Sequence, residues 1–160
     1  MAGEPMTAAD QGGLAREQPG QFGFVIGRID RMIRRRLTKR LAALDLSLPD
    51  YTVLSVLDRE PGISGAEVAR RTLVSPQAIN EMITSLERRE MIERSVDPGH
   101  ARVLQMRLTG TGAVALGRAR EIVAELEAEA FEGLSDDERQ RLLSLLWTCA
   151  ENIGAGVKRV

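Results

Sequence analysis

One short stretch of the chain, residues 75–89, combines a helix start with side chains that carry a donor and an acceptor together. Its sequence is SPQAINEMITSLERR. The amides of Gln77 and Asn80 suit the edge of an adenine, and the carboxylate of Glu81 could accept a hydrogen bond from a cytosine. The alternative is a polar helix face that only meets water. The elements that position this stretch decide between the two.

The residues around Ser75 predict a helix that begins there. Serine is a favoured N-cap, and Pro76 at the first helical position has a backbone angle suited to a helix. Val74 has the spacing to pack on Ile79 as a hydrophobic staple. The stripe expected to pack on the domain is Ile79, Met82, Ile83 and Leu86. The opposite face then carries Gln77, Asn80, Glu81, Thr84 and Arg88.

A second helix is predicted just before this one. Ser64 and Glu67 have the spacing of a capping box, and about three residues around Leu73 separate the two helices, which is the spacing of a helix-turn-helix. The second helix of that unit enters the major groove and presents its N-terminal residues to base edges. We therefore predict that this face reads double-stranded DNA. Free N–H groups at the helix start and basic residues at the end of the preceding helix suit phosphate. The residues expected there are Ser75, Pro76, Arg70 and Arg71.

Two strands are predicted after this helix. Residues 92–96 and 103–108 alternate with a period of two, and the sequence DPGH between them is a turn. A β-hairpin directly after a helix-turn-helix makes a winged helix. His100 in the turn is the only histidine, without a partner at metal-ligand spacing. A phosphate contact is therefore favoured for His100 over a metal site or catalysis.

The helices at both ends of the chain have apolar faces too long for a small domain to cover. Apolar residues recur at three and four from Phe22 to Leu44, and Ser135 with Glu138 opens a last helix. A second copy of the chain is the natural partner for these faces. We therefore predict a mainly α fold with a small β-hairpin wing, in which the N- and C-terminal helices form a dimerisation layer.

The predicted domains follow from these elements. Residues 1–20 are rich in Gly, Ala, Gln, Glu and Pro without an apolar period, so we expect them to be disordered. A dimerisation helix is expected over residues 21–46 and a winged helix-turn-helix DNA-binding domain over residues 47–109. Further dimerisation helices are expected over residues 110–160.

Composition indicates a soluble protein whose binding surfaces are local. Of 160 residues, 43% are hydrophobic and 28% charged, and the net charge of −1 gives no overall attraction to nucleic acid. No signal peptide or membrane span is evident, which predicts a cytoplasmic protein without a membrane partner. No nucleophile–base pair, P-loop or dinucleotide fingerprint is present, so we expect neither an enzyme nor a cofactor.

Three motifs carry a resemblance to a known family. They are VSPQAINEMITSLERREMIER (residues 74–94), DPGHAR (97–102) and LTGTG (108–112). In this order they resemble the MarR (multiple antibiotic resistance regulator) family of winged helix-turn-helix transcription factors. The resemblance implies a repressor that binds a pseudo-palindromic operator as an obligate homodimer, with a wing-tip arginine, here Arg102, in the minor groove. It also implies release by a small aromatic or phenolic ligand. Tyr51 is the first candidate to bind that ligand, and a tyrosine of the core is the alternative.

The chain departs from the family pattern at three places. Glu90 stands where glycine is usual, so it must adopt a left-handed conformation or end the helix differently. The wing tip is His100-Ala101-Arg102 in place of Asp-Arg-Arg, which leaves its minor-groove contact open. Glu81 stands where a basic residue is common, so the operator sequence cannot be inferred from relatives.

Three alternatives remain open. Cys149, the single cysteine, could make the protein a thiol-based redox sensor, but its alignment with Leu142 and Leu146 favours a buried, inert thiol. The winged helix could instead serve protein–protein contact without DNA. The basic run from Arg28 to Arg40 could bind nucleic acid or a membrane, although on a dimerisation helix it more often meets water.

Overall fold

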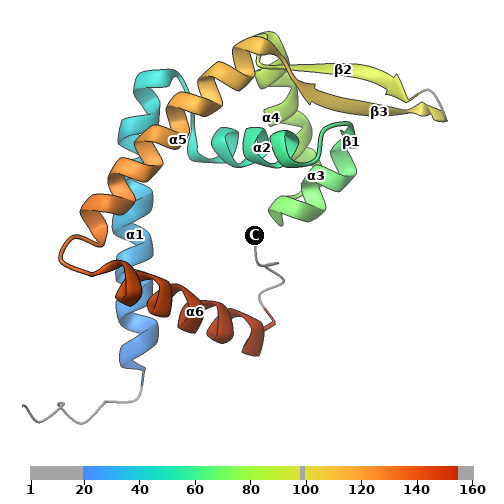
Figure 1. Ribbon diagram of the computed structural model, residues 1–160. Coiled ribbons are helices and arrows are strands. Elements are labelled where there is room, and N and C mark those ends of the chain that lie inside the picture. Colours follow the sequence, from blue (N-terminus) through green and yellow to red (C-terminus); the bar gives the residue numbers. More distant parts are fainter. Residues whose placement is uncertain (1–19, 98–99, 155–160) are drawn as a thin grey trace, which may run out of the picture. The chain divides into compact units, whose positions relative to one another are not determined.

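The computed structural model describes residues 20–97 and 100–154, and it is mainly helical with a small three-stranded sheet (Figure 1). The elements in chain order are α1 (Gln21–Leu41), η1 (Ala42–Leu44), α2 (Leu48–Arg59), β1 (Ile63–Ser64), α3 (Gly65–Thr72), α4 (Pro76–Arg88), β2 (Ile92–Asp97), β3 (His100–Leu108), α5 (Gly110–Ala130) and α6 (Asp136–Asn152). This order confirms the predicted fold class, including the helix-turn-helix and its wing.

The chain divides into two units between Met32 and Ile33, within α1. In the first unit, the large apolar side chains of α1 are exposed to solvent. They are Phe22, Phe24, Val25, Ile26, Ile29 and Met32. The second unit, from Ile33 onward, holds the rest of α1 and all later elements.

A single aliphatic core lies within the second unit. Each helix from α2 to α5 turns an apolar stripe into it, as the three- and four-residue spacing predicts. Its fully buried members include Leu54, Leu57, Val68, Ile79, Ile83, Leu86 and Leu116. The apolar face of α4 is therefore directed into the domain, which leaves the opposite face of the helix to solvent.

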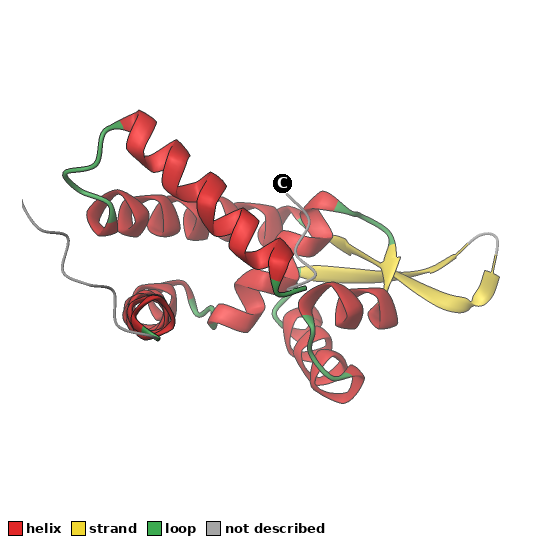
Figure 2. Ribbon diagram, turned by 90° about the horizontal axis from the view of Figure 1, so that it is seen from below, coloured by secondary structure: helices red, strands yellow, loops and turns green. Residues whose placement is uncertain are grey.

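The sheet has the order β1-β3-β2, with both pairs antiparallel. β2 and β3 form the predicted hairpin, which extends past the helices (Figure 2). β1 was not predicted, because two residues are too few for a periodic pattern. Its Ile63 lies opposite Met106 of β3, so this short strand fixes the start of α3 to the base of the wing.

Serine N-caps begin α2, α3, α4 and α6, but not all as predicted. Ser135 and Glu138 form the expected complete capping box, and a second complete box joins Ser47 to Asp50. At α3, Ser64 Oγ accepts from the N–H of Glu67, but the return half is missing. The predicted box there is wrong in that half, because the Glu67 carboxylate pairs with arginines of its own helix.

Within residues 20–97 and 100–154, three residues other than glycine adopt a left-handed backbone: Asp45, Leu73 and Glu90, with φ between 54° and 56°. Glu90 therefore takes the left-handed alternative that the sequence left open. The N–H groups of Glu90 and Met91 donate to Glu87 and Leu86 at 2.9 Å each, a closing pattern that normally uses glycine. The hydroxyl of Thr109 donates to the carbonyl of Glu90 at 2.6 Å.

The LTGTG motif brings α5 against the end of α4. A Cβ atom on Gly112 would lie 1.9 Å from the carbonyl oxygen of Met91, so only glycine fits there. α5 then packs on α2, where Arg120 Nη2 lies 2.7 Å from Asp58 Oδ2.

α6 differs from the other long helices because none of its residues is buried. Cys149 is exposed in the single chain, so the expectation of a buried thiol is not met there. The reason is that the apolar side chains of α6, among them Leu143, Leu145 and Leu146, are exposed as well. Over the described ranges, no helix is long and apolar enough to cross a membrane.

Candidate DNA-binding surface

The start of α4 is an open helix N-terminus. Ser75 Oγ accepts from the N–H of Ala78 at 3.3 Å, and Pro76 occupies the first turn. This turn contains no acidic residue, unlike the first turns of α2, α3 and α6. The first N–H groups of a helix have no helical acceptor and carry the positive end of its dipole. This end of α4 is therefore suited to a phosphate.

The polar face of α4 is exposed along its length. Its members are the predicted ones: Gln77, Asn80, Glu81, Thr84 and Arg88. Gln77 Nε2 donates to Glu81 Oε1 at 3.4 Å, so these two side chains present a joined amide and carboxylate. Asn80 makes no side-chain hydrogen bond within residues 20–97 and 100–154, which leaves its amide available to a base edge.

Thr84 is held by an arginine that the sequence did not single out. Arg94 of β2 donates from Nη2 to Thr84 Oγ1 at 3.1 Å and lies 3.0 Å from Glu87 Oε2. A side-chain contact between a strand and a helix ten residues earlier in the chain leaves no periodic pattern in the sequence. Arg94 joins the base of the wing to the middle of α4, so the two surfaces are oriented together.

The two arginines at the end of α3 are not equivalent. Arg71 Nη2 lies 2.7 Å from Glu60 Oε2 and 3.2 Å from Glu67 Oε1, so its guanidinium is engaged within the protein. Arg70 also pairs with Glu67, but its side chain is 76% exposed. Of the two, Arg70 is the better placed to meet a phosphate.

The wing carries the remaining predicted residues. β3 begins at His100, which pairs with Asp97 across a shift in strand register. Arg102 follows on the same strand. The side chains of His100 and Arg102 lie outside what the structure describes, as do Pro98 and Gly99 of the turn.

A cavity of about 280 Å³ lies between the helices of the second unit. Its lining residues are Arg34, Leu48, Pro49, Thr52, Val53, Thr72, Val74, Ile79 and Met82. Tyr51 is absent from the lining and packs half-buried against the core. The neighbouring Thr52 takes its place, because successive residues of a helix point in different directions.

Other candidate chemistry receives little support from the described residues. Within them, no three His, Cys, Asp or Glu side chains are grouped as metal ligands would be. Part of the basic run on α1 is engaged, since Arg40 Nη2 lies 2.7 Å and Arg36 Nη1 3.6 Å from the carboxylate of Glu129.

Known proteins share this arrangement. The MarR family profile matches residues 44–103. HTH-type transcriptional repressor Rv2887 of Mycobacterium tuberculosis is 30% identical over 134 residues, which cover 84% of this chain and 95% of that protein. The chain belongs to the MarR family. The crystal structure of MarR-family Rv2887 in complex with DNA matches with a TM-score of 0.72 at 26% identity, covering 83% of this chain and 98% of that one. The complex of Rv2887 with salicylic acid matches with a TM-score of 0.67 at 29% identity, covering 85% and 99%.

Membership confirms the resemblance drawn from the three motifs. It places the chain in a family of DNA-binding winged-helix transcription regulators, which is not a family of enzymes.

Proposed function

We propose that this MarR-family chain is a repressor that binds a pseudo-palindromic DNA operator as a homodimer. The observation that carries the proposal is the N-terminal half of α4, where an open, serine-capped helix start adjoins exposed Gln77, Asn80 and Glu81. A helix in this position of a winged helix reads base edges in the major groove. The domain roles are those of the sequence prediction: dimerisation by residues 21–46 and 110–160, and DNA binding by residues 47–109.

Each surface residue has its own part in the proposal. Gln77 and Asn80 read adenine, and Glu81 accepts from cytosine or orients Gln77. Thr84 and Arg88 extend the same face. Contacts to the DNA backbone come from Ser75, Pro76, Arg70, Arg71 and His100, and Arg102 enters the minor groove.

Dimerisation is supported by the two exposed apolar faces. One lies on the first part of α1 and the other on α6. Exposed apolar faces of this kind mark protein contacts. A dimer also supplies the two recognition helices that a palindromic site requires.

The first experiment separates base readers from phosphate contacts. Wild-type protein is used to select duplexes from a random pool, and variants are titrated against the selected duplex and against unrelated DNA. Gln77→Ala or Asn80→Ala should cost about 1–3 kcal/mol on the selected duplex alone. Arg70→Ala should weaken both duplexes alike and lower the salt slope. Arg118→Ala, an exposed arginine of α5, is the control for lost charge. A wild-type chain that enriches no sequence would refute the proposal.

A small aromatic ligand is proposed to release the DNA. The cavity of about 280 Å³ supports this, because apolar residues line it together with Arg34, Thr52 and Thr72 at the junction of α1, α2, α3 and α4. By linkage, such a ligand must weaken DNA binding by the factor by which DNA weakens ligand binding. Titrating salicylate in both directions measures that factor. Tyr51→Phe tests the part assigned to Tyr51. If its hydroxyl forms a hydrogen bond with the ligand, removing that hydroxyl should lower the affinity for the ligand.

The exposure of Cys149 supports a second candidate function, a thiol switch. In the proposed dimer the α6 face is covered, so we expect Cys149 to react slowly and Cys149→Ser to leave peroxide response unchanged. Release of DNA by peroxide in wild type but not in Cys149→Ser would establish the thiol switch instead.

A further inference from the structure

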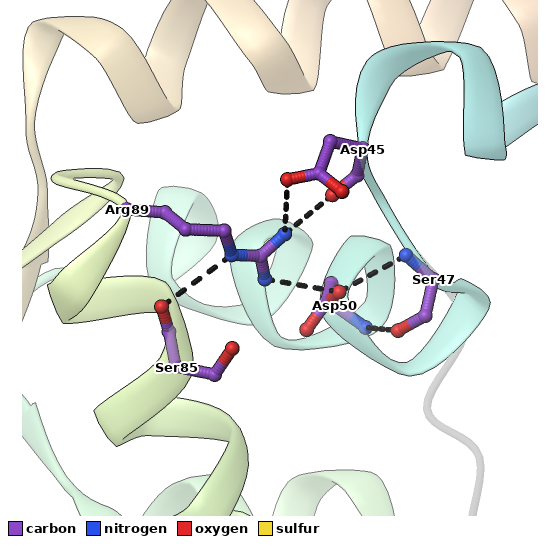
Figure 3. Close-up of polar contacts among 5 residues, drawn as sticks. All are labelled: Asp45, Ser47, Asp50, Ser85 and Arg89. Carbon is purple, nitrogen blue, oxygen red and sulfur yellow. Dashed lines mark hydrogen bonds and ion pairs between the residues drawn. The ribbon is translucent and has the colours of Figure 1, made fainter.

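A charged network ties the end of α4 to the corner that precedes α2 (Figure 3). Arg89 follows the last residue of α4, and its guanidinium is directed at two carboxylates. Nη2 lies 3.1 Å from Asp50 Oδ2, and Nη1 lies 3.8 Å from Asp45 Oδ2. Nη1 also donates to the carbonyl of Asp45, and Nε donates to the carbonyl of Ser85 at 3.4 Å. One side chain thus contacts its own helix and two points of another segment.

The partner side of the network lies at the start of α2 and in the turn before it. Asp50 belongs to the capping box of α2, where its Oδ2 accepts from the N–H of Ser47 at 3.0 Å. It is 8% exposed and is the single buried charged residue over the described ranges. A buried carboxylate must keep its partner, since removal of one member of such a pair is strongly destabilising. Asp45, in its left-handed conformation, closes the turn after η1. Arg89 is therefore bound to a segment that a capping box and a hydrogen-bonded turn hold in place.

Arg89 lies at the C-terminal end of α4, so a small change in angle there produces a larger displacement at the N-terminal end. α4 has 13 residues and is therefore about 20 Å long, so a tilt of about 10° at its C-terminus moves its N-terminus by about 3 Å. That displacement is about the length of a hydrogen bond, and hydrogen bonds to base edges weaken steeply when bent or stretched. Arg89 lies at one end of the helix, and Gln77 and Asn80 lie towards the other.

We propose that Arg89 is a positioning residue for DNA recognition, which sets the angle of α4 through Asp45 and Asp50 without touching the DNA. The guanidinium suits this part because it is planar and can bond in several fixed directions at once, which a lysine ammonium cannot. The inference rests on the proposed function, since it concerns how accurately the same surface reads bases.

The test compares selected and unrelated duplexes for Arg89 variants of the full chain. Arg89→Gln should weaken binding to the duplex that wild type selects by at least about fivefold, the lower end of couplings between sites. Binding to unrelated DNA should change less than twofold, because Arg70 and Arg71 on α3 supply backbone contacts that do not move with α4. Arg89→Lys should lose less affinity than Arg89→Gln, since it keeps the positive charge but lacks the planar guanidinium.

A second set of variants keeps the proposal testable if Arg89→Gln unfolds. Asp50→Asn keeps a side-chain oxygen that can accept from the N–H of Ser47, and it leaves Asp45 as a carboxylate for Arg89, so it should lose selectivity while it remains folded. Arg120→Gln is the matched control, because it breaks an arginine–aspartate pair between α5 and α2 that does not involve α4. It should lower thermal stability without changing the ratio of the two affinities.

The possible outcomes distinguish a failure of the proposed function from a failure of the positioning role. A wild-type chain that selects no duplex overturns the proposed function and this inference with it. If wild type selects a duplex, equal losses on both duplexes in Arg89→Gln and Asp50→Asn would show that the network only stabilises the fold. A melting temperature that falls while the ratio of affinities stays that of wild type would likewise overturn the positioning role.

Discussion

α4 and α6 are both amphipathic helices that begin at a serine N-cap, and they differ in what covers their apolar faces and what occupies their starts. α4 buries Ile79, Ile83 and Leu86 within its own chain, whereas α6 buries nothing. The first turns of the two helices differ in the opposite sense, since it is the start of α6 that has a partner within the chain. Glu138 closes the start of α6, whereas the first turn of α4 has no acidic residue. α4, whose apolar face is buried within the chain, has a start that could accept an anion. α6, whose start is capped by a carboxylate, has an apolar face that could accept a partner.

The contrast shows that a helix pattern does not specify its own partner. The same spacing of leucines and isoleucines is satisfied inside the chain at α4 and left exposed at α6. Exposed apolar faces mark protein contacts, and the exposed leucines of α6 are the reason why we propose an interface there. Because a helix start without a carboxylate favours anions, the start of α4 indicates a phosphate.

The largest expected effect comes from placing a charge on the apolar face of α6. Leu146→Glu should prevent dimerisation, because the carboxylate would be buried without a partner. Loss of the second recognition helix should lower affinity for the selected duplex by at least about a hundredfold. Light scattering should then report the 17.6 kDa chain mass instead of twice that value. Ser144→Glu, on another side of α6, is the control and should remain dimeric. A dimeric Leu146→Glu would mean that α6 does not form the interface.

A smaller effect is expected when the start of α4 is made to resemble that of α6. Ala78 occupies the position of Glu138 in the capping box, three residues after Ser75. Ala78→Glu should close the helix start and lower DNA affinity roughly tenfold, since it removes about 1.4 kcal/mol of attraction to a phosphate. Ala78→Gln can make the same box without the charge, so the difference between the two isolates the electrostatic part. Equal affinities for both would argue against a phosphate at this site.

The two left-handed residues that flank α4 predict an increase in stability when each is replaced by glycine. Leu73 and Glu90 both adopt a left-handed backbone, which costs about 1–2 kcal/mol for a residue with a side chain. Glycine removes that strain but loses about 0.5–1 kcal/mol through its more flexible unfolded chain. Leu73→Gly and Glu90→Gly should therefore each raise the free energy of unfolding by about 0.5–1 kcal/mol in urea titrations. Leu73 is 85% exposed, so little burial is lost with its side chain. A loss of stability at Glu90→Gly alone would assign its side chain a contact that matters.

Local patterns predicted the fold and which face of α4 is exposed, because periodicity and capping act within a few residues. The buried stripe and exposed polar face of α4 lie where the spacing indicates. The predicted box at Ser64 was half wrong because Glu67 had arginines within reach on its own helix. That competition depends on side-chain positions rather than on spacing.

Contacts between distant segments were not predictable from the sequence. Arg89 follows α4 and Asp50 lies in α2, and no spacing in the sequence relates the two, so only the folded chain brings them together. Thr52 lines the cavity and Tyr51 does not. Which of the two faces the cavity depends on the rotation of α2 about its axis, and the apolar spacing defines that rotation too coarsely. The exposure of Cys149 follows from the exposure of α6, none of whose residues is buried in the single chain.

The smallest expected effect is a pH dependence at the start of α6. The hydroxyl of Ser135 donates to Glu138 Oε2 at 2.7 Å and the N–H of Ser135 donates to the same oxygen at 2.8 Å, and these bonds lower the pKa of Glu138 below its ordinary value of 4.5. A carboxylate with a lowered pKa in the folded state stabilises the protein above its unfolded pKa, and this stabilisation is lost as the pH falls through the folded pKa. Glu138→Gln can keep one acceptor but cannot titrate. Wild type should therefore melt higher than Glu138→Gln at pH 7, and the gap should close as the pH falls below about 4.5. A gap that stays constant from pH 7 to pH 3 would mean that the carboxylate charge contributes nothing to the cap, and that α4 and α6 differ at their starts only in hydrogen bonding.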